Sequence, residues 1–134
     1  QYQKKLSGPI LDRIDLHVVV PPVAVEAIST GGKAESSVAI RERVNQARHM
    51  QSKRYMNSSW RINSELSNRD VEQFCNLEPE ARALVLKAVE KLNLSARAYH
   101  KVLKVARTIA DLAGDEVVTT QSASEAIQYR PVEN

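Results

Sequence analysis

The pattern of apolar and polar positions predicts helices over most of the chain from Ser36 onward. A long helix is expected over residues 36–54, and a short one from the N-cap residue Ser67 to about Cys75. Residues 55–66 lie between them and lack a regular period. The less polar positions of the long helix are Val38, Ile40, Val44, Ala47 and Met50.

Three further helices follow in the second half of the chain. Pro79 opens one, which ends at Asn93 in a left-handed conformation. Ser95 caps the next, which runs to 112–113 and is closed by Gly114. The last is capped by Thr119 or Thr120 and runs through Gln128. The chain therefore contains about five predicted helices.

The amino-terminal residues follow a different pattern. Residues 15–20 form a nearly continuous β-branched run, typical of a strand that is covered on both faces, and Pro21-Pro22 ends it. A lone strand is not stable, so we expect its sheet to lie before Gln1. The predicted fold is mainly α, a helical bundle over 36–134, preceded by a remnant strand and a linker over 1–35.

Composition sets limits on the class of protein. The chain has 134 residues, about one domain, of which 43% are hydrophobic, as in ordinary globular proteins. Its single cysteine, Cys75, excludes an internal disulfide and is interpreted as a small buried apolar residue. No apolar run approaches the ~18 residues of a membrane span. Because neither an initiator Met nor a signal peptide is present, the chain is expected to belong to a longer protein.

Charge is unevenly distributed along the chain. The net charge is only +3. Residues 41–61 nevertheless hold six Lys and Arg side chains against Glu42 alone. Such a segment is either a solvated helix face or a contact surface for nucleic acid or an acidic partner. The candidate contacts are Arg48, Lys53 and Arg54.

Motifs for catalysis are absent from the chain. It contains no phosphate-binding loop, no HExxH and no GxSxG, and its three histidines lack metal-ligand spacing. We expect no metal site, and no catalysis by this chain alone. In the helix at 95–113, Arg97, Lys101 and Lys104 share one narrow side opposite a broad apolar face. This basic strip is either solvated or an anion site, favoured by the position of Arg97 in the first turn.

Two long motifs resemble a known family. Residues 7–18 (SGPILDRIDLHV) and 94–112 (LSARAYHKVLKVARTIADL) look like the end of the core and the lid of magnesium-chelatase-like AAA+ ATPases of the ComM/YifB type. The closing EAIQYR also fits, so the resemblance covers essentially the whole chain. It implies a cytoplasmic ATP hydrolase that assembles as a ring, commonly a hexamer, and that remodels a macromolecule, with DNA as the expected partner.

The resemblance also implies roles for two arginines. Arg13 would be an arginine finger that reaches the γ-phosphate in a neighbouring subunit. Arg97 would be the sensor-2 residue, which reads the nucleotide of its own subunit. ATP and Mg²⁺ would be bound by the intact protein and not by this chain alone, because the phosphate loop would precede Gln1.

Two alternatives stay open at this point. Arg13 could instead pair structurally with Asp12 or Asp15. The whole chain could be a non-enzymatic helical module that binds nucleic acid through residues 41–61, or that binds another protein.

Overall fold

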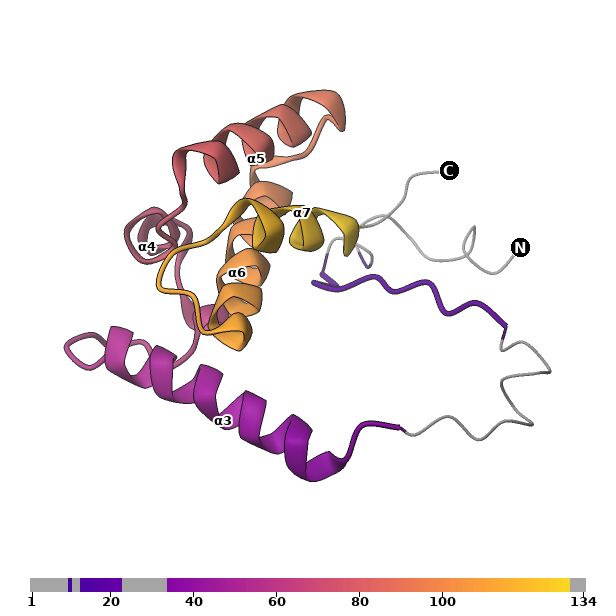
Figure 1. Ribbon diagram of the computed structural model, residues 1–134. Helices are drawn as coiled ribbons and strands as arrows, with labels where there is room; N and C mark the ends of the chain where they lie inside the picture. Colours follow the sequence, from indigo (N-terminus) through magenta and orange to yellow (C-terminus); the bar gives the residue numbers. More distant parts are fainter. Residues whose placement is uncertain (1–9, 11–12, 23–33, 131–134) are drawn as a thin grey trace.

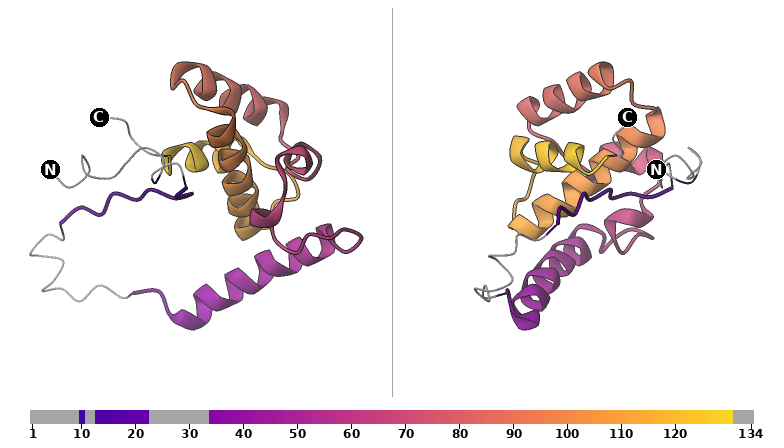
Figure 2. Two further views of the ribbon diagram at one scale, coloured as in Figure 1. Left: turned by 180° about the vertical axis from the view of Figure 1, so that it is seen from behind. Right: turned by 90° about the vertical axis from the view of Figure 1, so that its right-hand side faces the viewer.

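The computed structural model describes residues 10, 13–22 and 34–130, and this part of the chain is almost entirely helical (Figure 1). Helix α6 lies at its centre, with α3 on one side and α5 and α7 on the other (Figures 1 and 2). The five predicted helices are confirmed. The elements are α3 (Ser37–Arg54), the 3-10 helix η2 (Asn63–Glu65), α4 (Asn68–Phe74), α5 (Pro79–Lys91), α6 (Ala96–Ala113) and α7 (Thr120–Gln128).

Most of the helix ends are built by the residues that the sequence indicates, and Ser36, which was expected within the first helix, is its N-cap. Each of four N-cap side chains accepts a hydrogen bond from the backbone N–H three residues on, which satisfies one unpaired donor of the first turn. These N-caps are Ser36, Ser67, Ser95 and Thr119. Two left-handed residues lie at the expected stops, Asn93 with φ 46° and Gly114 with φ 83°. Local chemistry thus sets the helix boundaries.

The core lies where α6 packs against α4 and α7, with α5 packed on α7. Most of its buried side chains are small, and three are larger. The small ones include Val71, Ala81, Val85, Ala106, Ala110, Ala123 and Ala126, and the larger ones are Tyr55, Leu66 and Leu103. Cys75 is completely buried among them, as predicted. A short parallel bridge between Leu77 and Val118 ties the two interhelical loops together.

Helix α3 is packed over only part of its length. Ala47 and Gln51 are its buried residues. Three of the less polar positions in its first half are exposed: Val38 by 62%, Ile40 by 43% and Val44 by 42%. The first half of α3 extends away from the other helices (Figure 1). The sequence pattern therefore identified the helix. It did not show that only the second half of the helix is packed against the rest of the protein.

The amino-terminal segment differs from the prediction. Residues 15–20 are not assigned to a strand in the structure, and Val19 and Val20 are 82% and 83% exposed. A strand requires a neighbouring strand for its backbone hydrogen bonds, and no other strand is present in the part of the chain that the structure describes. Most of the predicted linker, residues 23–33, lies outside the described residues.

Candidate functional site

The first turn of α6 places Arg97 beside backbone N–H groups that have no partner within the helix. Ser95 Oγ accepts the N–H of Ala98 at 3.2 Å and so fixes the start of the helix. Arg97 is the second residue of α6, and it is exposed. The remaining N–H groups of this turn and the helix dipole favour a bound anion.

Residues 13–17 form a short segment that is attached to α6 and α7. The N–H of His17 donates to the carbonyl oxygen of Tyr129 at 2.8 Å, just after α7. On α6, the ammonium group of Lys101 donates to the carbonyl oxygen of Ile14 at 3.1 Å and pairs with the carboxylate of Asp15 at 3.3 Å. These contacts hold the neighbouring residue, Arg13, close to the helical bundle.

Arg13 and Arg97 line the same cavity, which has a volume of about 600 Å³. Lys101 and Lys104 add two more positive charges to its wall, whereas the carboxylates there are those of Asp15 and Glu125. The apolar part of the lining comprises Leu16, Val105, Ile109 and Leu112, with the ring of Tyr129. A cavity of this size and mixed character, with an excess of positive charge, suits a small anionic molecule.

The predicted basic strip on α6 therefore faces a cavity and the protein, and it is not simply solvated. Lys101 binds the 13–17 segment, and Lys104 Nζ donates to the carbonyl oxygen of Ser64 at 3.4 Å. The structural alternative for Arg13 is not supported at Asp15, because that carboxylate pairs with Lys101. Asp12 lies outside the described residues.

The candidate nucleic-acid contacts of α3 separate into two groups. Arg48 and Lys53 are exposed. Arg54 is not available as a surface contact, which corrects the expectation from the sequence: its guanidinium pairs with Asp111 of α6 and donates to Asn63 Oδ1 at 3.2 Å. Its position at the packed end of α3 explains the difference, because a charge there must have a partner.

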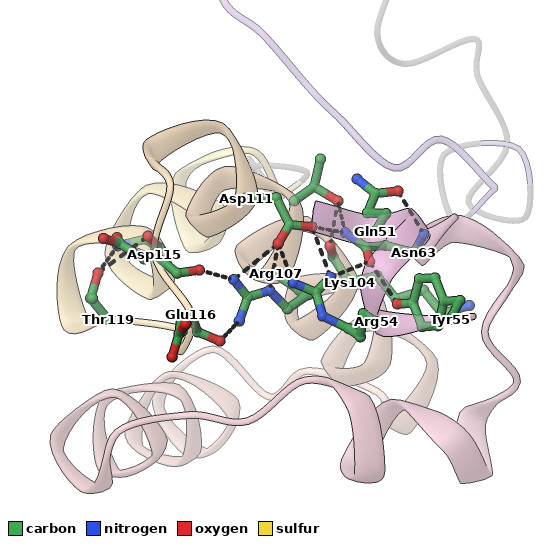
Figure 3. Close-up of polar contacts among 12 residues, drawn as sticks. Gln51, Arg54, Tyr55, Asn63, Lys104, Arg107, Asp111, Asp115, Glu116 and Thr119 are labelled. Carbon is green, nitrogen blue, oxygen red and sulfur yellow. Dashed lines mark hydrogen bonds and ion pairs between the residues drawn. The ribbon is translucent and has the colours of Figure 1, made fainter. Parts of the chain in front are cut away.

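Asp111 is the centre of a buried polar cluster that the sequence did not reveal (Figure 3). Its carboxylate accepts from the guanidinium groups of Arg54 and Arg107, and from Asn63 Nδ2 at 2.8 Å. Arg107 is 1% exposed and also donates to the carbonyl oxygens of Asp115 and Glu116. The cluster thus joins α3, η2, α6 and the loop after α6.

The two buried arginines respond differently to their surroundings. Burial opposes the charge of Arg54, but hydrogen bonding and attraction to Asp111 outweigh it and raise the pKa of Arg54. For Arg107 burial dominates and lowers the pKa, although Asp111 acts in the opposite direction. Both remain cations at neutral pH, because guanidinium groups do not deprotonate in proteins. One signal was present in the sequence: Arg107 and Asp111 have the i, i+4 spacing of a helical ion pair.

The described residues contain no group of three or more His, Cys, Asp or Glu side chains that could hold a metal ion. Among them there is also no helix that is both long and apolar enough to cross a bilayer.

His100 lines the cavity, and its Nδ1 atom is buried without a hydrogen-bond partner in this part of the chain.

The helical bundle and its preceding segment match two family models. The model described as magnesium chelatase, subunit ChlI C-terminal, matches residues 34–130, and that described as magnesium chelatase, subunit ChlI, matches residues 1–28. The chain belongs to this magnesium-chelatase-like family, which is an AAA+ family.

Within the family, the chain is similar to proteins of the ComM/YifB type. It is 40% identical to competence protein ComM of Haemophilus influenzae over 131 residues, which are 97% of this chain and 25% of that protein. It is 38% identical to the uncharacterized protein YifB of Escherichia coli over 134 residues, which are 99% of this chain and 26% of that protein. The chain therefore spans about a quarter of the length of these relatives.

Proposed function

We propose that this chain is the lid region of a ring-forming ATP hydrolase and that Arg13 and Arg97 act on the phosphates of a bound nucleotide. The observation that carries the proposal is that both side chains line one positively charged cavity. A planar, permanently charged guanidinium group can bind two phosphate oxygens at once. During hydrolysis, negative charge develops on the γ-phosphoryl group, where such groups act most strongly.

The shared cavity changes one expectation from the sequence. Separate roles would place Arg97 on the nucleotide of its own subunit and Arg13 on that of a neighbour. Because both line one cavity, the arrangement supports their acting on a single ligand. We therefore propose that the two arginines bind one nucleotide, and that both act on the neighbouring subunit if Arg13 does.

The rest of the ATPase site would lie outside this chain. The sequence has no phosphate-binding loop, and the described residues offer no cluster of metal ligands. We propose that the remainder of the intact cytoplasmic protein, assembled as a hexameric ring, supplies the phosphate loop and the Mg²⁺ ligands. This chain would contribute positive charge and close the site.

Substitution in the intact protein tests the first part of the proposal. Arg13→Ala should leave ATP binding nearly unchanged and reduce the rate of hydrolysis by roughly 10³–10⁵, as for other arginine fingers. Arg13→Lys should recover little, because it keeps the charge but loses the two-pronged geometry. The exposed surface residue Lys87 of α5 offers a control, and Lys87→Ala should hydrolyse ATP normally. An unchanged rate in Arg13→Ala would contradict the proposal.

Mixed rings test whether the two arginines share a nucleotide. Mixing Arg13→Ala with Arg97→Ala subunits should restore no activity if both side chains act on the same site, because every site then lacks one of them. If they act on different nucleotides, the mixture contains some complete sites and activity returns. As a control, Arg13→Ala subunits mixed with subunits that lack their own phosphate-loop lysine should regain activity, because the arginine arrives from the neighbour.

The exposed basic residues of α3 support a second candidate function, in which the chain binds DNA. After Arg43 pairs with Glu35 and Arg54 with Asp111, Arg41, Arg48 and Lys53 are still exposed on this helix. One relative carries the name competence protein, which is consistent with such a role. A salt titration of single-stranded DNA binding tests it, since each phosphate contact should contribute a log–log slope of about −0.7.

A non-enzymatic module that uses only this surface would keep its DNA affinity in Arg13→Ala and lose it in a combined Arg48→Ala and Lys53→Ala variant. If that double variant binds DNA as the parent does, α3 is not the DNA contact.

A further inference from the structure

Polar contacts to α6 and α7 hold the segment that carries Arg13 to the helical bundle. Among the described residues, Asp15 and the carbonyl oxygen of Ile14 bind Lys101, and the N–H of His17 binds Tyr129. Residues 13–16 are exposed, and the apolar side chains of Ile14 and Leu16 are 44% and 51% exposed, so burial of apolar surface fixes their place only in part. The position of Arg13 therefore depends in part on individual polar contacts.

Lys101 is the side chain that contributes most of these contacts. Its ammonium group lies 3.3 Å from the Asp15 carboxylate and 3.1 Å from the Ile14 carbonyl oxygen, on the two residues that follow Arg13. The Lys101 side chain is 21% exposed, so it is largely enclosed between α6 and this segment. Lys104, about one turn further along the same helix, binds Ser64 instead and does not share this role.

We propose that Lys101 is a positioning residue, which holds the 13–17 segment so that Arg13 projects into the cavity beside Arg97. This inference rests on the proposed function, and it replaces the sequence-based expectation that Lys101 contacts the anion itself. Asp15 is its partner in this role. The pair thus couples the first two turns of the lid helix α6 to the residue that would act on the γ-phosphate.

Removing the contact between Lys101 and Asp15 should change the stability of the fold little and the rate of catalysis strongly. A partly exposed ion pair adds little to the stability of the fold. A misplacement of about 1 Å in a group that acts on the transition state can reduce the rate by about 10²-fold. Loss of the contact should therefore appear in kcat, whereas loss of a direct phosphate contact should also weaken substrate binding.

Hydrogen exchange in this chain tests the positioning step without reference to ATP. The amide of His17 reports attachment of the segment, because it donates to Tyr129. In Lys101→Ala and in Asp15→Asn it should exchange at least about threefold faster than in the parent, and the double variant should add little to either. Lys104→Ala, the matched control, should leave this amide unchanged. Parental exchange in Lys101→Ala would overturn the proposal.

ATP hydrolysis by the intact protein tests the consequence. Lys101→Ala and Asp15→Asn should each lower kcat at least about tenfold with little change in KM, and Lys101→Arg should restore part of the rate. Combining Lys101→Ala with Arg13→Ala should be no worse than Arg13→Ala alone. If Lys101→Ala raises KM while Asp15→Asn hydrolyses ATP normally, Lys101 contacts the nucleotide and the proposal is wrong.

The two measurements also separate this inference from the proposed function. If Arg13→Ala hydrolyses ATP normally, the proposed function fails. Faster exchange at His17 in Lys101→Ala would still show that Lys101 attaches the segment.

Discussion

Helix α6 carries two sets of charged residues: one is buried in the protein, and the other lines a cavity. Toward its carboxyl end, Arg107 and Asp111 are each 1% exposed, and the Asp111 carboxylate accepts hydrogen bonds from Arg107, Arg54 and Asn63. Toward its amino end, Arg97, Lys101 and Lys104 line a cavity of about 600 Å³. Charges whose partners are all internal hold the fold together, whereas charges that line a cavity are available to a ligand or to a neighbouring segment.

The largest expected effect comes from removing the acid at the centre of the buried set. Asp111→Ala leaves Arg54 and Arg107 without their shared carboxylate, and loss of one partner from a buried ion pair costs about 3–5 kcal/mol. Urea unfolding should show this decrease in the free energy of unfolding. The equivalent change beside the cavity is Asp15→Ala, which removes the partner of Lys101 and should lower the free energy of unfolding by less than about 1 kcal/mol. Equal losses in the two variants would contradict the distinction.

The sequence predicted the helices well because their signals are local. Serine and threonine caps, Pro79, Asn93 and Gly114 each act within one turn of the residue concerned. The buried cluster could not be predicted in the same way. Arg54 lies in a basic run, and only the crossing of α3 and α6 brings it to Asp111, 57 residues later.

The candidate site shows the same limit. The family resemblance indicated Arg13 and Arg97 as separate features, and nothing in their spacing places them on one cavity. Their proximity depends on how the 13–17 segment crosses α6. The contact between Lys101 and Asp15 that holds it there joins α6 to a residue of the amino-terminal segment.

The fold should also lose stability in alkaline solution, because two ionisable side chains, Cys75 and Tyr55, are buried in its core. Burial raises the pKa of the Cys75 thiol to about 12, and it raises the pKa of Tyr55 to about 12 against the opposing effect of Arg54. Above the ordinary thiol pKa of ~8.5, the unfolded chain loses protons that the folded chain retains, so stability falls with rising pH.

Urea unfolding between about pH 7 and pH 11 measures this loss, which should begin near the ordinary pKa of cysteine. Cys75→Ala removes the first part of the decline and leaves the later part, which belongs to tyrosine. A constant free energy of unfolding over this range would show that these groups titrate equally in the folded and unfolded chains.

A smaller effect is expected at the carboxyl end of α6, where Gly114 leads into the loop that binds Arg107. Gly114 has φ 83°, and a Cβ atom added there would meet nothing within 4 Å. Gly114→Ala should therefore cost only the backbone strain of a left-handed residue, about 1–2 kcal/mol. Gly114→Asn should cost less, because asparagine tolerates this conformation better. Thermal unfolding of both variants distinguishes strain from a steric clash, which would penalise asparagine at least as much as alanine.

The smallest expected effect is the stabilisation of the fold by an anion bound at the cavity that Arg97, Lys101 and Lys104 line. Without a phosphate loop the chain should bind pyrophosphate weakly, and a ligand at a concentration equal to its Kd stabilises the folded state by only about 0.4 kcal/mol. Thermal unfolding in millimolar pyrophosphate, at constant ionic strength, should show a small stabilisation that disappears in Arg97→Ala. Arg48→Ala on α3 serves as the control and should keep it, because its charge lies outside the cavity lining. If the stabilisation persists in Arg97→Ala and in Arg13→Ala but is lost in Arg48→Ala, the anion binds α3, and the cavity is not the phosphate site.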